Sequence, residues 1–280
     1  MKRKYLSVLF LACSIGLVGC STNAVTTTAD SSSAQVEIAS AQGVDYTLYD
    51  DVLSSYVDED GWVIYDVLQP SRQLLDSFNN GLAEVDDATL SNWSEPEQIA
   101  FWINAYNSLT LKSIVDQTPL KPSIKDITGV WRLRKHPINQ NQKTLNEIEH
   151  DVLRVDFDEP RLHAAIVCAA ISCPPLRNEA FTGENLDTQL DEQVEQWLAR
   201  PDGLKIDKSA GEVKISKIFD WFGGDWIPSY GVDAGFTGSK EERAVLNFIS
   251  NYVSDDDRAY LEAGEYTLSY FDYDWALNKQ

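Results

Sequence analysis

The sequence predicts an α+β fold: a single domain of packed helices with a small, mostly antiparallel sheet. Capped segments with helical hydrophobic spacing recur along the chain, whereas a hairpin pattern is found near residue 210. Helices and strands do not alternate as they would in a doubly wound parallel sheet. Aromatic residues make up 11% of the 280 residues, which supplies enough apolar surface for a large core.

The N-terminus predicts export and lipidation. Basic residues at positions 2–4 precede an apolar run over residues 5–18, which is typical of a secretory signal peptide. The following LVGC resembles the bacterial lipobox, and this resemblance implies cleavage before Cys20 and acyl chains on that cysteine; Cys13 leaves with the signal. A transmembrane anchor is the alternative, but the run is shorter than the roughly 20 residues that a bilayer needs.

These features predict three segments. Residues 1–19 are the signal peptide, residues 20–43 are the lipidated cysteine and a disordered tether of small polar residues, and residues 44–280 form a single globular domain. Ser21 after the lipidated position is similar to the pattern that directs lipoproteins to the outer membrane. We therefore expect an outer-membrane lipoprotein of the bacterial cell envelope that is held to the membrane through Cys20 and faces the periplasm.

The charge of the chain argues against nucleic acid as a partner. The chain has 23 Lys+Arg and 44 Asp+Glu, and removal of residues 1–19 takes away three basic residues and no acidic one, which leaves a net charge near −24. Such a surface repels phosphate backbones, whose binding depends on clustered basic residues. The expected partner is a peptide or an envelope protein.

The strongest helix is expected to begin at Ser94, where Ser94 and Glu97 form a capping box with Pro96 in the first turn. Apolar residues then occupy nearly the whole circumference, which predicts a buried helix. Asn104 and Asn107 lie on one face of it. Each either satisfies neighbouring backbone groups or acts at a site, by orienting a histidine or donating to an oxyanion.

Further elements follow at intervals. A second capping box at Thr144 predicts a helix to about residue 155, in which the neighbours Glu149 and His150 point to different faces. An amphipathic pattern predicts a helix over 186–200, and a capping box at Ser239 predicts another. The remaining expected elements are a hairpin with strands starting at residues 203 and 211 and a closing strand over 266–278 that packs its aromatic residues onto the core.

The segment from residue 161 to 181 concentrates the reactive side chains, since it contains His163, Cys168 and Cys173. Neither a strand nor a helix brings His163 and Cys168 together at a separation of five residues. Pro174 disfavours helical geometry at Cys173, so a turn after Cys168 is plausible. Such a turn could carry Cys173 back toward His163 or toward Cys168.

Four interpretations of the cysteines remain open. Export to an oxidising compartment favours a Cys168–Cys173 disulfide, worth about 2 kcal/mol for so short a loop. A histidine could instead hold one cysteine as a nucleophilic thiolate, with Asn104 or an acid fixing the ring. A metal site is a third possibility, although H-x4-C-x4-C matches no common zinc pattern. Two buried thiols that act as small hydrophobes are the fourth. We expect no cofactor and no metal.

Five segments in order resemble the domain-of-unknown-function 547 family: AFWINAYNSLTL, LNEIEHDVLR, PRLHAAIVCAAISCPPL, KISKIFDWF and YDWALN. The resemblance covers roughly residues 95 to 278 and implies no assigned reaction. More distantly, the chain is similar to papain-like and transglutaminase-like thiol enzymes, which combine cysteine, histidine and asparagine or aspartate. The matching segments contain Asn104, Glu149, His150, Arg154, His163, Cys168 and Cys173. Papain-type enzymes place the cysteine on an early helix, whereas here that helix carries Asn104.

Two functions are therefore expected as alternatives. In the first, the domain performs thiol-dependent hydrolysis or acyl transfer on a peptide or amide, where Cys173 attacks, His163 or His150 is the base, and Asn104 orients the base. In the second, the domain is a non-catalytic envelope binding module with a structural Cys168–Cys173 disulfide. The count of free thiols in the oxidised mature protein separates the two.

Overall fold

The structure, a computed structural model, describes residues 44–280. The expected signal peptide (1–19) and lipidated tether (20–43) lie outside the described residues. From residue 44 onward, no helix combines the length and the apolar character needed to cross a bilayer.

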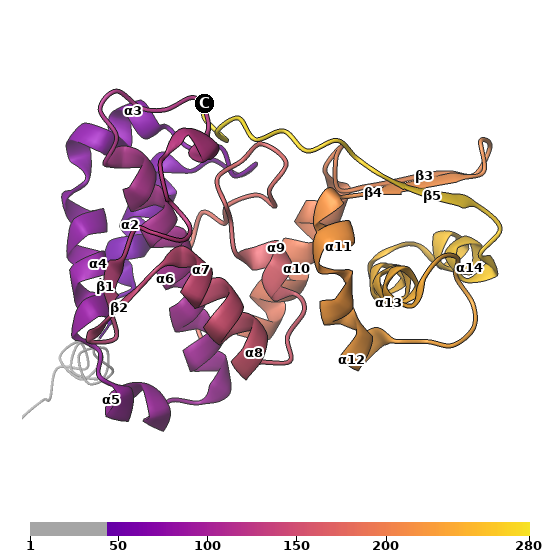
Figure 1. Ribbon diagram of the computed structural model, residues 1–280, viewed down its shortest axis with the longest axis horizontal. Coiled ribbons are helices and arrows are strands. Elements are labelled where there is room, and N and C mark those ends of the chain that lie inside the picture. The colour runs from indigo at the N-terminus through magenta and orange to yellow at the C-terminus, as the bar shows by residue number, and fades with distance from the viewer. Residues whose placement is uncertain (1–43) are drawn as a thin grey trace, which may run out of the picture.

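Helical elements dominate the described residues (Figure 1). In chain order they are α2 (Thr47–Tyr56), α3 (Tyr65–Leu68), η1 (Gln69–Ser71), α4 (Gln73–Glu84), α5 (Asp87–Asn92), α6 (Glu95–Val115), η2 (Ile124–Asp126), α7 (Leu145–Glu147), η3 (Ile148–Leu153), α8 (Arg154–Asp156), α9 (Leu162–Ala165), α10 (Leu186–Ala199), α11 (Lys217–Phe222), η4 (Gly223–Trp226), α12 (Ile227–Tyr230), α13 (Lys240–Ile249), η5 (Ser250–Tyr252) and α14 (Asp255–Ala263).

Two small sheets accompany the helices, which confirms the predicted α+β class. Strands β1 (His136–Ile138) and β2 (Asn141–Lys143) form an antiparallel pair. In the second sheet, β3 (Leu204–Asp207) pairs with β4 (Glu212–Ile215) as the expected antiparallel hairpin, and β5 (Thr267–Tyr270) joins β4 in parallel. Two of the three strand pairings are antiparallel, as predicted.

Helix α6 is the central buried helix. Its capping box at Ser94 and Glu97 is present, with proline in the first turn, and nearly every residue from Ile99 to Val115 is buried. Apolar side chains around its whole circumference find partners because α3, α4, α7, η3 and α10 all contact it. This helix therefore forms the base on which the other elements of the N-terminal half are arranged.

The core consists of two hydrophobic clusters. The first is built from residues between 44 and 190 together with Leu277, and the second from residues between 194 and 266 together with Ala164. The second cluster takes its side chains mainly from α10, α11, α13, α14 and the β3–β5 sheet. In Figure 1 the elements α11, α13, α14 and the sheet lie together on one side of the molecule. Helix α10 belongs to both, since it contributes Leu190 to the first cluster and Trp197 to the second.

The C-terminal segment 271–280 connects the clusters. It leaves β5 and runs back to the first cluster (Figure 1). The expected strand over 266–278 is wrong beyond Tyr270, since the chain then makes only single bridges: Ser123↔Ala276, Ala170↔Leu277 and Val63↔Lys279. Its partners lie on three separate loops, so no continuous ladder can form.

Elements α7, η3 and α8 form one continuous helix from residue 145 to 156, which begins at the predicted Thr144 capping box. Its middle, η3, is a π-helix: the backbone N–H of Arg154 bonds to the carbonyl of Glu149, five residues earlier. The wider turn changes the direction of the side chains on it, and single π-turns of this kind are frequent at functional sites.

Candidate functional site: a pocket lined by both clusters

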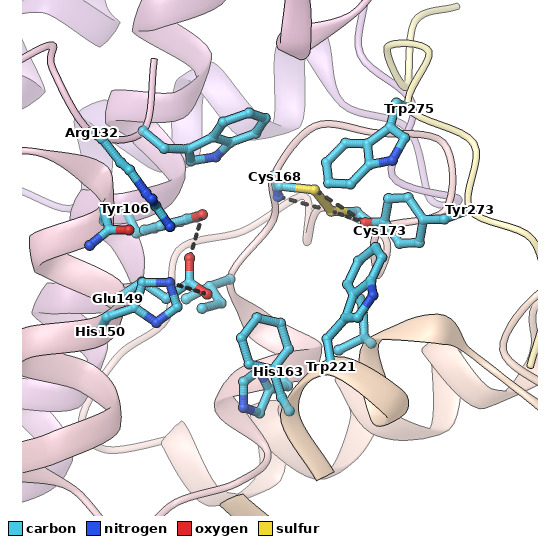
Figure 2. Close-up of a pocket in the computed structure, with 15 residues that line it drawn as sticks. Tyr106, Arg132, Glu149, His150, His163, Cys168, Cys173, Trp221, Tyr273 and Trp275 are labelled. Atoms are coloured by element: carbon cyan, nitrogen blue, oxygen red, sulfur yellow. Dashed lines mark hydrogen bonds and ion pairs between the residues drawn. A yellow bond between two sulfur atoms is a disulfide. The ribbon is translucent and has the colours of Figure 1, made fainter. Parts of the chain in front are cut away.

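A pocket of about 240 Å3 is lined by side chains from both hydrophobic clusters. Figure 2 shows polar side chains on one side of the cavity and aromatic rings on the other. Its lining consists of Tyr106, Trp131, Arg132, Asn146, Glu149, His150, His163, Ile166, Cys168, Cys173, Ile218, Trp221, Phe222, Tyr273 and Trp275.

Three side chains form what we call the aromatic wall: Trp221 from α11 and Tyr273 and Trp275 from the C-terminal segment. Their ring centroids lie 4.6 Å apart for Tyr273 and Trp275, 4.8 Å for Trp221 and Tyr273, and 5.8 Å for Trp221 and Trp275. Trp131 meets Trp275 edge-on at 5.9 Å. Such spacings are those of favourable ring pairs, so the rings support one another in one arrangement.

Four side chains form the opposite, polar wall: Tyr106, Arg132, Glu149 and His150 (Figure 2). The Tyr106 hydroxyl donates to Oε2 of Glu149 at 2.9 Å, and the Glu149 side chain is only 12% exposed. Burial, together with the adjacent Glu149 charge, raises the pKa of Tyr106 well above its ordinary value of 10.0. Tyr106 therefore remains a hydrogen-bond donor to a sheltered carboxylate.

The π-helix places Glu149 and His150 in the same pocket. We expected these neighbours to point to different faces of an α-helix, and that expectation is wrong: both line the cavity, with His150 Nε2 3.8 Å from Glu149 Oε1. The physical reason is the i→i+5 bond of η3, which widens the turn and reduces the angle between successive side chains.

Behind the polar wall, one carboxylate organises two other side chains. Asp225, in η4, accepts from Arg154 through Nε at 2.6 Å and Nη2 at 2.9 Å, and Nε2 of His163 donates to it at 2.8 Å. Burial opposes ionisation of Asp225, but these hydrogen bonds outweigh it and hold its pKa well below the ordinary 3.8. Asp225 is thus a fixed negative charge.

This network also fixes the orientation of the two imidazoles. Arg154 has no acceptor, so its contact with Nδ1 of His150 leaves that nitrogen as the acceptor and puts the ring hydrogen on Nε2, on the Glu149 side. His163 is 4% exposed and stacks between Phe222 and Trp226 at centroid distances of 4.7 and 5.0 Å. His163 is thus held from α11 and η4, and His150 is held through Arg154, which itself pairs with Asp225 of η4.

Cys168 and Cys173 are joined by a disulfide in the wall of the pocket. The expected turn is present: Ala169 adopts a left-handed φ of 61°, and the backbone N–H of Cys173 bonds to the carbonyl of Ala170 at 3.1 Å. The Tyr273 hydroxyl lies 3.3 Å from the sulfur of Cys168 and 3.2 Å from that of Cys173. The disulfide therefore supports the aromatic wall from behind.

The loop closed by the disulfide also anchors the C-terminal segment. The backbone N–H of Ile171 donates to the carbonyl of Ala276 at 2.8 Å, and the hydroxyl of Ser172 accepts from the backbone N–H of Asp274 at 3.0 Å. These bonds flank Trp275 on both sides. The position of that ring thus depends on the conformation of residues 168–173.

Five of the residues singled out from the sequence meet in this pocket: Glu149, His150, His163, Cys168 and Cys173. Of the interpretations left open for the cysteines, the disulfide is the one present. Among the hydrogen bonds of residues 44–280, no imidazole nitrogen contacts either sulfur, whose polar partners are the Tyr273 hydroxyl and the backbone N–H of Cys168.

Asn104, the remaining predicted site residue, is not part of the pocket lining. Its amide is fully buried and pairs with the backbone of Phe181, donating to the carbonyl at 2.7 Å and accepting from the N–H at 3.0 Å. Asn107 does the same for Ala165 and Val167. Both asparagines thus hold irregular backbone against α6.

Sequence reasoning did not identify most of the pocket. Asp225 and the aromatic wall come from stretches far from the cysteines. Trp221, Tyr273 and Trp275 lie in the segments KISKIFDWF and YDWALN that carry the family resemblance, but nothing in those segments assigns them to a site with the cysteines. A signal existed for the polar wall, because Glu149 and His150 are adjacent polar residues on an otherwise amphipathic helix. Because neighbours on an α-helix point in different directions, the sequence did not predict a shared site for the two, and hydrophobic spacing does not reveal the π-turn on which they lie.

Nothing among the described residues is arranged as a metal centre: residues 44–280 contain no group of three or more His, Cys, Asp or Glu side chains that could hold an ion. Residues 90–198 match the family described as "Protein of unknown function, DUF547". No curated protein and no solved structure matches the chain. The matched residues include the polar wall and the disulfide loop, whereas the aromatic wall lies outside them.

Proposed function

We propose that this chain, whose residues 90–198 belong to the DUF547 family, is a non-catalytic envelope binding module that takes a small peptide-like ligand into the pocket between its two walls. The observation that carries this proposal is the Cys168–Cys173 disulfide. It leaves the pocket with a shape and polar groups but without a free thiol. A structural disulfide in an exported protein is also the usual state of a cysteine pair.

The chemistry of the lining supports ligand binding. Small-molecule sites are concave, mostly apolar and aromatic, and contain a few polar groups that fix orientation. Here Trp221, Tyr273 and Trp275 supply apolar area, and Glu149 with its Tyr106 partner supplies a directional acceptor. Rings that already pack against one another lose little conformational entropy when a ligand binds.

The proposed location follows from the N-terminal sequence. Cleavage before Cys20 and acylation there would hold the domain at the outer membrane, with residues 20–43 as the tether on the periplasmic side. Metabolic labelling with a palmitate analogue tests this. We expect label on the mature chain and none on a Cys20→Ser variant, and label retained by that variant would contradict lipidation at Cys20.

A count of free thiols tests the structural disulfide. The native, oxidised mature protein is treated with iodoacetamide before and after unfolding with a reductant, and the peptides that contain Cys168 and Cys173 are identified by mass spectrometry. We expect neither cysteine to be labelled in the native protein and both after reduction. Native labelling of Cys173 would overturn the binding-module proposal in favour of a thiol enzyme.

The second candidate function is thiol-dependent hydrolysis or acyl transfer on a peptide or amide, with Cys173 as the nucleophile. One observation favours it: both sulfurs and the imidazoles of His150 and His163 line the same cavity. A dithiol reductant would have to open the disulfide first. If this candidate is right, reduced protein hydrolyses peptide esters or amides and a Cys173→Ala variant does not; equal activity of the two excludes it.

A further inference from the structure

We propose that the ligand of this pocket carries a primary ammonium group, which binds between the Glu149 carboxylate and the aromatic wall. The inference rests on the proposed binding function and names the chemical class that the pocket selects. Three features lead to it: the acceptor capacity of Glu149 that no described residue uses, the tryptophan rings on the opposite side of the pocket, and the strongly acidic charge of the chain.

The Glu149 carboxylate is sheltered but only partly satisfied. Oε2 accepts from Tyr106 at 2.9 Å, whereas Oε1 accepts no hydrogen bond from the described residues and lies 3.8 Å from Nε2 of His150, beyond hydrogen-bond distance. A carboxylate that is 12% exposed is costly unless donors or a cation meet its remaining lone pairs. An ammonium supplies three donors and the opposite charge at once.

The opposite side of the cavity suits the same group. Trp221, Tyr273 and Trp275 stand across the cavity from Glu149 (Figure 2). The faces of tryptophan and tyrosine rings attract cations, and this attraction grows when water is displaced. The ring of Trp275 already takes part in such a contact, because Nζ of Lys125 lies 4.9 Å from its centroid.

Two cations near the pocket oppose a positively charged ligand. Arg132 lines it without an ion pair to another described residue, and Lys125 approaches Trp275; both side chains are exposed, so salt and water screen them. The chain as a whole, with 44 acidic and 23 basic residues, attracts cations. An anionic ligand would be repelled by the sheltered Glu149 carboxylate. A neutral ligand would leave Oε1 of Glu149 without a counter-charge.

Three probes of one shape separate these cases: benzylamine, benzyl alcohol and benzoate. Isothermal titration calorimetry on the full mature chain at pH 7 and low ionic strength should rank them amine, alcohol, carboxylate. We expect the amine to bind roughly tenfold tighter than the alcohol, and this advantage to shrink in high salt. Equal binding of amine and alcohol overturns the ammonium inference but leaves the binding function intact, whereas no binding by any probe contradicts both.

Matched variants locate the effect. Glu149→Gln keeps an oxygen for the Tyr106 hydroxyl but loses the charge, so amine binding should fall roughly tenfold while alcohol binding is unchanged. Arg132→Gln should tighten the amine by a small factor, because it removes a like charge. Glu195→Gln, on the exposed face of α10, is the control and should change nothing. Unchanged amine affinity in Glu149→Gln would sink the proposal.

The aromatic contribution has its own pair of variants. Trp221 is 44% exposed, so its replacement should leave the fold intact. Trp221→Leu should weaken the amine severalfold more than the alcohol, and Trp221→Phe should restore part of that selectivity because a ring face remains. Equal losses for the two probes in Trp221→Leu would mean that the ring acts through apolar area alone, against a cation–π role.

Peptides then identify the source of the ammonium. One tripeptide has a free N-terminus and no lysine, a second has an acetylated N-terminus and one lysine, and a third is acetylated without lysine. Tighter binding of the first or of the second than of the third supports the proposal and assigns the group to a main-chain amine or to a lysine side chain. Equal binding of all three contradicts ammonium recognition.

Discussion

At the scale of single residues, Asp225 connects the two histidines of the pocket. It accepts directly from His163 and, through Arg154, governs His150. Asp225→Asn should therefore destabilise the fold by about 2 kcal/mol, because it weakens charge-assisted hydrogen bonds to two partners at once. Urea unfolding checks this, with Asp220→Asn as the control. Asp220 pairs with Lys217 on the surface, and its loss should cost about 0.5 kcal/mol or less.

The same carboxylate predicts an acid limit. The pKa of folded Asp225 is depressed below 3.8, so its contribution to stability is complete above that value and is lost as the pH falls further. The difference in unfolding free energy between the wild type and Asp225→Asn should thus shrink below about pH 4. A difference that stays constant down to pH 3 would mean that the charge of Asp225 contributes little.

His136 gives a second pH prediction at higher pH. It is buried in β1, and burial, with help from the Lys112 charge, lowers its pKa from 6.5 to about 4. The unfolded chain takes up the proton first, so stability is complete above pH 6.5 and declines as the pH falls toward 4, by about 3 kcal/mol. His136→Gln should remove this decline, and parallel stability curves for the two proteins between pH 7 and 4.5 would contradict it.

At the residue scale, the sequence predicted those features that depend on residues close together in the chain. The turn after Cys168 followed from Pro174 and brought Cys173 back to it. Asn104 shows the limit of this approach. A buried amide on a central helix can either act at a functional site or hydrogen-bond to nearby backbone, and only the folded position of Phe181 shows that Asn104 does the second. Partners separated by 77 residues cannot be read from local spacing.

At the scale of elements, the helix that carries Glu149 depends on its first turn. Thr144 accepts from the backbone N–H of Glu147, whose carboxylate bonds back to the N–H of Thr144. Thr144→Ala should cost about 1 kcal/mol in unfolding free energy, and Thr144→Ser, which keeps the hydroxyl, should cost less. Thermal or urea unfolding measures both. Equal losses would mean that the buried methyl group, not the cap, matters at this position.

The predicted helices with capping boxes are present, since those signals lie within four residues of one another. Two features of the elements escaped prediction. The π-turn of η3 leaves no trace in hydrophobic spacing, and the aromatic pattern of 266–278 suggested a longer strand than β5. The aromatic residues of 271–280 favour a strand, but this segment crosses between the two hydrophobic clusters, where no neighbouring strand is available to pair with it. Its tertiary environment therefore outweighs its strand propensity.

At the scale of the whole molecule, the C-terminal segment joins the halves, and Asn278 is its main anchor. Its side chain accepts from the Tyr65 hydroxyl at 2.7 Å and donates to the carbonyl of Gly61 at 3.0 Å. Asn278→Ala should cost about 2 kcal/mol or more, because it leaves buried partners unpaired. Gln280→Ala, at an exposed position, should change stability by about 0.5 kcal/mol or less. Similar losses in the two variants would contradict the anchoring role.

The fold class was predictable because helix caps and the hairpin are local. The pocket was predictable only in part, since it combines α6, the π-helix, the disulfide loop, α11 and the C-terminal segment. Tyr106 and Trp275 both line this pocket although they lie far apart in the sequence. Such assemblies are set by long-range topology, which a hydrophobic pattern does not encode.

The two walls of the cavity belong to different parts of the architecture, with Glu149 on a helix of the N-terminal half and Trp221 on α11. A guest that touches both would act as a bridge, so occupancy should slow hydrogen exchange in α11 as well as in η3. Protection confined to one half would show that the guest rests on a single wall.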